Sequence, residues 1–425
     1  MFLQRLGRCI RTLHFANMLT HKNLGQAEGG TLFGRTRISS MLELPRFDFQ
    51  PTTRVVFGER AIDQLGSLAK ELNGRRVLVV TDPGLISAGH VERALHSLKK
   101  ESIDVCLFSG VEENPTTKHV EDGVRFAKEN KSIDLIVGLG GGSVMDCAKG
   151  INFLLTNGGK MENYRGMGKA TKPMLPSIGI PTTAGTGSEA QSYALIAKAD
   201  THEKMACGDL KARFRVVILN PTLLISVPKK VMAITGIDAI SHAIESYVST
   251  RRNPISQMFA REAWRLLEKN FEAILREPEN LEAQGEMLLG AHLAGAAIEN
   301  SMLGAAHACA NPLTARYGIT HGVAVGLMLP QVIKFNGQAV DEEYKDLLHL
   351  AGFPEKNFSS GGEQLAKRIV EQKTAAKLPQ RLRECDVEEH VLPELAEAAA
   401  KEWTGNFNPR PVMETQFLEL YRASF

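Results

Sequence analysis

The sequence has few cysteines, no long apolar run and almost no net charge. Its 425 residues include six cysteines, and no two of them have Cys-x-x-Cys spacing. This argues against a secreted disulfide scaffold or a zinc ribbon, and predicts reduced thiols. The best apolar run, Met287 to Ile298, contains a histidine and is too short to span a bilayer. We therefore expect a cytoplasmic protein that does not interact with a membrane.

Charge is nearly balanced, with 50 Lys+Arg against 48 Asp+Glu and a net charge of +2. No broad positive field follows from this balance, so nucleic acid is not an expected partner. The composition, 43% hydrophobic and 23% charged, is typical of globular proteins and excludes disorder as the dominant state.

Residues 1–40 differ from the rest, because they contain six basic residues and one acidic residue. They lack the continuous apolar core of a secretory signal. We expect either a disordered extension, with the working chain starting near Met41, or a transit-like segment. A transit peptide would make the location mitochondrial instead of cytoplasmic.

Two regions follow this extension. Short apolar runs at 76–82, 105–110 and 134–140 alternate with amphipathic helical segments, which predicts a parallel sheet covered on both faces. After Pro228 helical periodicity dominates, and Asn253-Pro254 has the form of a helix start. We predict an α/β domain over 41–222 and an all-helical domain over 223–425.

A glycine-rich segment, Gly140 to Asp146, follows the strand that ends at Leu139 and opens a helix. Consecutive glycines let backbone N–H groups approach a phosphate, and a helix N-terminus attracts an anion. A turn without a ligand, using glycine for a positive φ, is the alternative. The segment differs from the GxGxxG fingerprint, which belongs to the first strand–helix turn.

That first turn contains Asp82, followed by Pro83. A carboxylate at a strand end binds ribose hydroxyls in dinucleotide sites and repels a 2′-phosphate, which favours NAD over NADP. Turn formation is its alternative role. Another loop, Pro181 to Glu189, is rich in small hydroxyl-bearing residues that suit a polar ligand, although an ordinary turn is again the alternative.

A candidate metal site combines one carboxylate with three imidazoles. Asp238 and His242 are four residues apart, so on a helix they share one face, and His307 and His321 follow fourteen residues apart. Three nitrogens and one oxygen suit Fe²⁺ or Zn²⁺ better than Mg²⁺ or Ca²⁺. Periodicity alone does not show that the two segments meet.

Two further residues lie near this set in the sequence. His292 is interpreted as structural, since the set is complete without it. Glu245 has two alternative roles, either orienting a metal ligand or lying on the helix surface.

In order and spacing these motifs resemble the iron-containing alcohol dehydrogenase family, from about Phe47 to the C-terminus. The resemblance implies a Rossmann-like α/β N-terminal domain followed by an all-α C-terminal domain, the dehydroquinate synthase-like architecture. The segments that carry it are Gly140–Lys149, Pro181–Glu189, Gly236–Glu245, the His307/His321 pair and Asn408–Arg410.

The family implies an NAD-dependent alcohol dehydrogenase, an oxidoreductase acting on CH–OH groups of a small alcohol or aldehyde. A divalent metal, Fe²⁺ in preference to Zn²⁺, would assist hydride transfer between the alcohol and an aldehyde or ketone. A homodimer is expected. The implied metal ligands are Asp238, His242, His307 and His321. The implied cofactor-binding residues are Asp82, Asn114, Gly141, Gly142, Ser143, Asp146, Thr182, Thr183, Thr186 and Lys204.

One position departs from the family pattern. Many members have a further histidine four residues after the first histidine of the fourteen-residue pair, and this chain has Asn311 there. An amide does not transfer a proton at neutral pH, so the proton relay is left unassigned. Three alternatives stay open: a hydroxyacid–oxoacid transhydrogenase with bound NAD, a zinc lyase of the same fold, and a non-enzymatic nucleotide or metal sensor.

Overall fold

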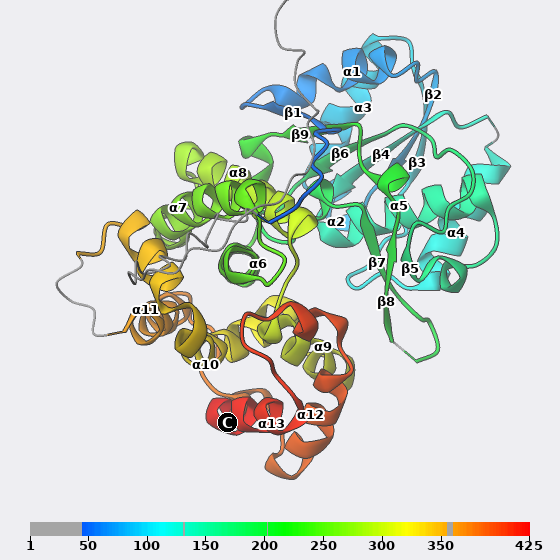
Figure 1. Cartoon of the computed structure of the whole chain (residues 1–425). Helices are drawn as coiled ribbons and strands as arrows, with labels where there is room; N and C mark the ends of the chain where they lie inside the picture. Colours follow the sequence, from blue (N-terminus) through cyan, green and yellow to red (C-terminus); the bar gives the residue numbers. More distant parts are fainter. Residues whose placement is uncertain (1–44, 131, 202, 355–359) are drawn as a thin grey trace, which may run out of the picture. The chain divides into compact units, whose positions relative to one another are not determined.

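The N-terminal half is built on a six-stranded sheet in which every strand runs parallel (Figure 1). The computed structural model describes residues 45–425 except 131, 202 and 355–359, so the predicted extension over 1–40 lies outside the described residues. The strand order is β1-β9-β6-β4-β2-β3. The strands are β1 (Arg54–Phe57), β2 (Arg76–Val80), β3 (Asp104–Phe108), β4 (Leu135–Gly140), β6 (Ser177–Pro181) and β9 (Val216–Leu219).

The central strands are apolar along their whole length because helices cover both faces of the sheet. β4 and β6 are buried at every position. β1 is an edge strand with mostly exposed residues. The covering helices include α1 (Leu65–Glu71), α3 (His90–Lys100), α4 (Thr117–Glu129) and α5 (Gly142–Asn157), with the short α2 (Pro83–Ser87) after β2.

A smaller three-stranded sheet lies beside α5, and the sequence did not predict it. Its strands β7 (Tyr193–Ala197) and β8 (Lys204–Gly208) pair antiparallel, while the two-residue β5 (Gly166–Met167) pairs parallel with β8. Figure 1 shows β7 and β8 projecting downward below α5 and the main sheet.

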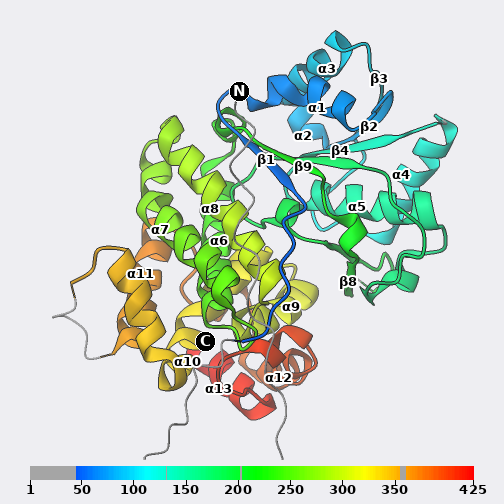
Figure 2. The ribbon, with the colours of Figure 1, turned by 45° about the horizontal axis from the view of Figure 1, so that its top comes forward.

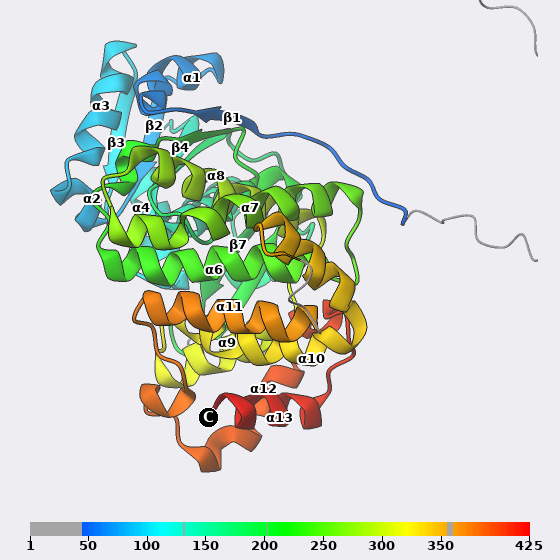
Figure 3. The ribbon, with the colours of Figure 1, turned by 90° about the vertical axis from the view of Figure 1, so that its left-hand side faces the viewer.

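From α6 onward the described residues are helical, as predicted. α6 lies at the centre and packs on α7, α8 and α10, and nearly all its residues from Met232 onward are buried (Figure 3). The helices are α6 (Lys229–Val248), α7 (Pro254–Arg276), α8 (Leu281–Asn300), α9 (Ala305–Tyr317), α10 (His321–Leu350), α11 (Gly361–Ala375), α12 (Leu392–Ala400) and α13 (Glu414–Ser424).

The predicted helix start at Asn253 is confirmed. The Asn253 side chain accepts hydrogen bonds from the backbone N–H groups of Ile255 and Ser256, and Pro254 occupies the first helical position. These contacts satisfy donors that have no partner inside the helix.

The last strand of the main sheet ends at Leu219 and α6 begins at Lys229, close to the predicted boundary at 222/223. Residues 45–425 nevertheless cluster as one compact unit, so the division into two domains stays a prediction. Among the helices of the described ranges, none combines the length and apolar character needed to cross a bilayer.

A close backbone contact joins the two halves. Gly187, which follows β6 and has φ of +60°, lies against Gly295 of α8, and a side chain on Gly295 would meet the Gly187 carbonyl oxygen at 2.4 Å. Glycine at both positions therefore allows the 181–189 loop to pack directly on the helix.

We expect Gly295→Ala to lower the free energy of unfolding by about 1–3 kcal/mol, because the added methyl group overlaps this backbone. The matched control is Gly337→Ala in α10, where the added carbon has its nearest neighbour at 3.4 Å and alanine improves helix propensity. Urea unfolding, monitored by circular dichroism, compares the stabilities of the two variants. Equal midpoints for the two variants would contradict the contact.

Candidate metal and cofactor site

α6 presents Asp238 and His242 on one face, one helical turn apart, as predicted. The Nε2 atom of His242 lies 3.6 Å from Oδ1 of Asp238, and both side chains are 6% exposed. Two more histidines reach the same place from different helices. His307 is near the start of α9, and its Nε2 lies 3.8 Å from the same Asp238 oxygen.

His321 is the first residue of α10 and completes the group. The ring centroids of His242 and His307 are 4.9 Å apart, and those of His307 and His321 are 5.4 Å apart. Potential ligand atoms of Asp238, His307 and His321 lie within 4.8 Å of one another, with His242 adjoining through Asp238. The structure therefore brings together the two segments whose convergence the sequence left open.

Several buried polar atoms of this group have no hydrogen-bond partner. They are Asp238 Oδ1, His242 Nδ1, His307 Nε2 and His321 Nδ1. Buried polar atoms are normally paired, so four unpaired atoms in one cluster fit a site that binds an ion. The set of imidazole nitrogens and a carboxylate oxygen is one that Fe²⁺ and Zn²⁺ accept.

The protonation states agree with this role. Burial lowers the pKa of His242, and the partial offset from Asp238 does not restore it. Burial also lowers the pKa of His321 well below its usual range, with a further contribution from Lys204. Both rings are therefore neutral at pH 7, which is the form that binds a metal.

Glu245 binds Nδ1 of His307, the ring nitrogen that does not face Asp238. Its Oε2 lies 2.6 Å from Nδ1 of His307, and it also accepts hydrogen bonds from the backbone N–H groups of Ala306 and Gly304. Burial alone would raise the pKa of Glu245, but His307 and these N–H groups outweigh it and the pKa is lowered. The carboxylate thus directs Nε2 of His307 toward Asp238.

The predicted helix-surface alternative for Glu245 is wrong, because its side chain is only 3% exposed.

The start of α9 is packed so closely around Glu245 that position 304 has no room for a residue larger than glycine. A side chain on Gly304 would lie 2.9 Å from Oδ1 of Asn408 and 3.0 Å from Oε1 of Glu245. Asn408, in the C-terminal Asn-Pro-Arg segment, accepts a hydrogen bond from the N–H of Ala305.

The glycine-rich segment lies where the strand order of the sheet reverses. β2 pairs with β3 on one side and with β4 on the other, and Asp82 and Gly141 follow the carboxyl ends of β2 and β4. This crevice is the usual ligand site of open α/β sheets. Gly141 is extended, so these glycines serve close approach and not a positive φ.

Most predicted cofactor residues meet at this crevice. A side chain on Gly142 would lie 2.5 Å from Thr186, and one on Gly141 would lie 3.4 Å from Thr183. The backbone N–H of Thr182 donates to the Gly140 carbonyl. Ser143 Oγ is 3.3 Å from the backbone nitrogen of Asn114, which has a left-handed φ of 53°.

Three other predicted residues have clear local surroundings. Asp82 caps α2 by accepting the N–H of Leu85 at 3.1 Å, so the turn role is present whatever else Asp82 binds. Lys204, at the start of β8, lowers the pKa of His321 and therefore lies within electrostatic range of the metal cluster.

Asp146 is buried below the loop. It accepts a hydrogen bond from Ser188 Oγ at 2.5 Å and lies 3.5 Å from the ammonium of Lys149. Lys149 also donates to the carbonyls of Ser188 and Tyr193 at 2.7 Å and 2.6 Å. Burial raises the pKa of Asp146 and lowers that of Lys149. The pair ties the 181–189 loop and β7 to α5.

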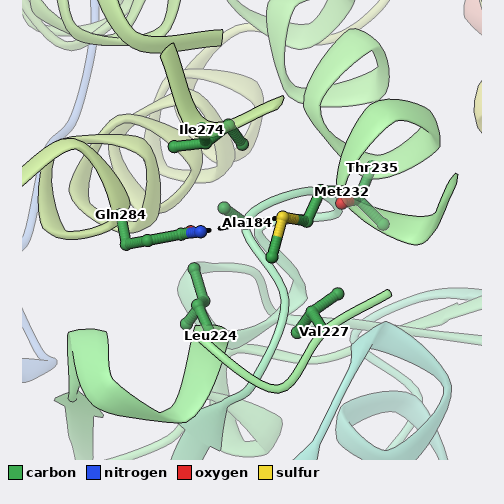
Figure 4. A pocket seen from close by; sticks show the side chains of 7 residues that line it. All are labelled: Ala184, Leu224, Val227, Met232, Thr235, Ile274 and Gln284. Atoms are coloured by element: carbon green, nitrogen blue, oxygen red, sulfur yellow. Dashed lines mark hydrogen bonds between the residues drawn. The ribbon is translucent and has the colours of Figure 1, made fainter. Parts of the chain in front are cut away.

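The structural interpretation of His292 fits its contacts, because its Nδ1 lies 3.2 Å from the buried Glu189 carboxylate. A small cavity of about 10 Å³ lies beside Ala184, between the 181–189 loop and α6 to α8 (Figure 4). It has room for about one water molecule and is lined mainly by apolar side chains such as Leu224 and Ile274, so it is a packing gap.

The sequence did not indicate the hydrogen-bond partner of Asn311. Its amide donates to Oε2 of Glu402 at 2.8 Å. The two residues are 91 positions apart and no local motif marks Glu402, so only the fold brings them together.

Comparison with known proteins assigns the family. Residues 51–221 match the model of the iron-containing alcohol dehydrogenases, and residues 232–425 match the C-terminal domain model of the same family. The chain belongs to the iron-containing alcohol dehydrogenase family. Membership confirms the predicted fold class. It also confirms an oxidoreductase of the alcohol dehydrogenase type that acts on small alcohols or aldehydes, and the metal in the family description agrees with the predicted divalent metal. NAD appears in the description of a methanol dehydrogenase relative and in that of a sulfoacetaldehyde reductase from Bifidobacterium kashiwanohense solved in complex with NAD+.

Individual relatives agree with this assignment. The 1,3-propanediol dehydrogenase of Klebsiella pneumoniae is 34% identical over 89% of this chain and 99% of its own length. The NAD-dependent methanol dehydrogenase of Bacillus methanolicus is 31% identical over 84% of this chain and 93% of its own. A crystal structure of 1,3-propanediol oxidoreductase superposes with a TM-score of 0.87 at 34% identity, covering 90% of this chain and all of that one.

We expect Lys149→Met to lower the free energy of unfolding by about 3–5 kcal/mol, because it leaves the buried Asp146 without its counter-ion. Lys118→Met, on the exposed face of α4, is the matched control and should change stability by no more than about 0.5 kcal/mol. Chemical denaturation of both variants measures the difference. A Lys149→Met protein as stable as the control would show that the buried contacts contribute little.

Proposed function

We propose that this chain transfers hydride between an alcohol and NAD with its metal ion held by Asp238, His242, His307 and His321. The cluster of unpaired buried ligand atoms on α6, α9 and α10 is the observation that carries the proposal. When bound, the metal would supply Lewis acidity toward the alcohol oxygen, and NAD would supply the hydride acceptor. The family description favours iron over zinc.

Residues of the chain would orient the metal ligands and bind the cofactor. Glu245 keeps His307 in one tautomer and orientation, so that its Nε2 points into the cluster. The N-terminus of α5 at Gly141 to Ser143 would bind the NAD pyrophosphate through backbone N–H groups and the helix dipole. In the Thr182–Thr186 loop, Thr183 and Thr186 pack against Gly141 and Gly142 at the same crevice.

We also propose a homodimer in a reducing compartment. β1 pairs only with β9 among the described strands and lies at an edge of the sheet (Figure 2). The side chains of Val55 and Phe57 in β1 are 42% and 51% exposed. An exposed apolar edge strand favours pairing with a second chain. The described cysteines are free and mostly buried, which supports a reducing location such as the cytoplasm.

The metal assignment is tested with His307→Ala. We expect the bound iron or zinc per chain to fall by at least about tenfold, and NADH formation from alcohols to fall with it. His96→Ala, an exposed position on α3, is the control. Elemental analysis of anaerobically purified protein, followed by an alcohol panel, gives both readouts. Retained metal and rate would contradict the assignment, and turnover without added NAD would favour the transhydrogenase alternative.

The cofactor assignment of Asp82 is tested with Asp82→Asn. The amide oxygen still accepts the Leu85 N–H, so α2 keeps its cap while the charge is lost. We expect kcat/KM with NADP to rise about tenfold relative to NAD, equivalent to about 1.4 kcal/mol of removed repulsion. Asp104→Asn, at the opposite end of the neighbouring β3, is the control. An unchanged preference would leave Asp82 with the capping role alone.

A further inference from the structure

Asn311 lies on the same face of α9 as His307, because the two residues are four positions apart. One turn of helix, about 6 Å, separates their backbone positions. The Asn311 side chain is partly exposed, unlike the buried residues before it in α9. It donates its amide N–H to Glu402. The Glu402 carboxyl group is therefore hydrogen-bonded to a side chain that lies one helical turn from His307.

Glu402 follows the end of α12, where the chain turns back toward the α/β half. The next residue, Trp403, packs on Tyr193 of β7 with ring centroids 5.9 Å apart. Lys204 lies within electrostatic range of both His321 and Glu402, because its ammonium acts to lower the pKa of each. Glu402 thus lies within electrostatic range of Lys204 on β8 and directly precedes a residue that packs on β7.

Several charged or titratable groups surround Glu402. Burial raises its pKa above the usual value, and the Asn311 hydrogen bond, Arg165 and Lys204 oppose this only in part, while Glu203 adds to it. Tyr421 of α13 also lies within electrostatic range, but its hydroxyl donates to the Cys309 carbonyl and burial raises its pKa well above the usual range.

The other carboxylates near the cluster have different partners. Asp238 belongs to the metal cluster, and Glu245 is held by His307 and two backbone N–H groups. Glu402 has one side-chain hydrogen bond, to a neutral amide, and is partly exposed to solvent. These surroundings leave it able to gain and lose a proton.

We propose that Glu402, positioned by Asn311, exchanges the hydroxyl proton of the substrate with solvent. The proposal rests on the alcohol dehydrogenase function. In oxidation the carbinol C–H bond breaks and its electron pair leaves with the hydride to NAD⁺. The O–H bond breaks, a C=O bond forms, and the proton passes to a Glu402 oxygen directly or through one water before it reaches solvent. Reduction reverses each transfer.

The test is Glu402→Gln, which preserves the side-chain shape and removes the ionisation. We expect kcat/KM for alcohol oxidation at pH 7 to fall about 100-fold. In the wild-type protein the oxidation rate should fall as pH decreases through the Glu402 pKa, since the base must be deprotonated. That acid limb should be missing from the variant. Glu397→Gln, on the exposed side of α12, is the matched control and should keep both rate and profile.

Two further measurements separate proton exchange from a structural role. Glu402→Ala should regain activity with added formate, while Glu397→Ala should not respond. Asn311→Ala should move the acid limb to higher pH, because it removes a hydrogen bond that lowers the Glu402 pKa. Metal content and NAD binding should match the wild type in every variant.

A failure of the Glu402 proposal can be distinguished from a failure of the proposed function. An active wild-type chain whose Glu402→Gln variant retains both its rate and its acid limb would overturn this proposal alone. A wild-type chain with metal and NAD that oxidises no alcohol would overturn the proposed function, and this proposal with it.

Discussion

The hydrogen bond between Glu245 and His307 is the contact on which the arrangement of the candidate metal ligands depends. It joins α6 to the first turn of α9, and the same carboxylate also receives two backbone N–H groups of that turn. A buried carboxylate with three partners keeps its charge and fixes the imidazole in one orientation. Gly304 and Asn408 complete the arrangement, since the space beside the carboxylate admits no larger residue than glycine.

The predicted cofactor crevice and the cluster of Asp238, His242, His307 and His321 are held together by packing as well as by charge. Lys149 anchors the 181–189 loop to α5, and Gly187 of the same loop lies against α8. One loop therefore contacts the glycine-rich helix start and the helical half together. Hydride transfer requires the alcohol carbon and the nicotinamide ring to be aligned, and a misplacement of about 1 Å can cost about 100-fold in rate, so a rigid connection of this kind would serve catalysis.

Local patterns predicted the elements whose signals are local. The apolar runs of β2, β3 and β4, the Asn253 cap and the pairing of Asp238 with His242 across one turn depend on neighbours within a few residues. The β7–β8 hairpin was missed, and so was Glu402, because its hydrogen bond to Asn311 joins residues 91 positions apart. The role of Asp146 in the cofactor cleft stays a prediction, and its described side-chain partners are Ser188 and Lys149.

The sequence by itself determined the types of chemistry available: a glycine-rich helix start after a strand, and an inventory of one carboxylate and three imidazoles suited to a transition metal. Only the tertiary structure decided that His307 and His321 meet Asp238, and that Glu245 lies behind His307 and not at the surface. The reason is that helix periodicity specifies which residues share a face, whereas the packing of α6, α9 and α10 specifies which faces meet.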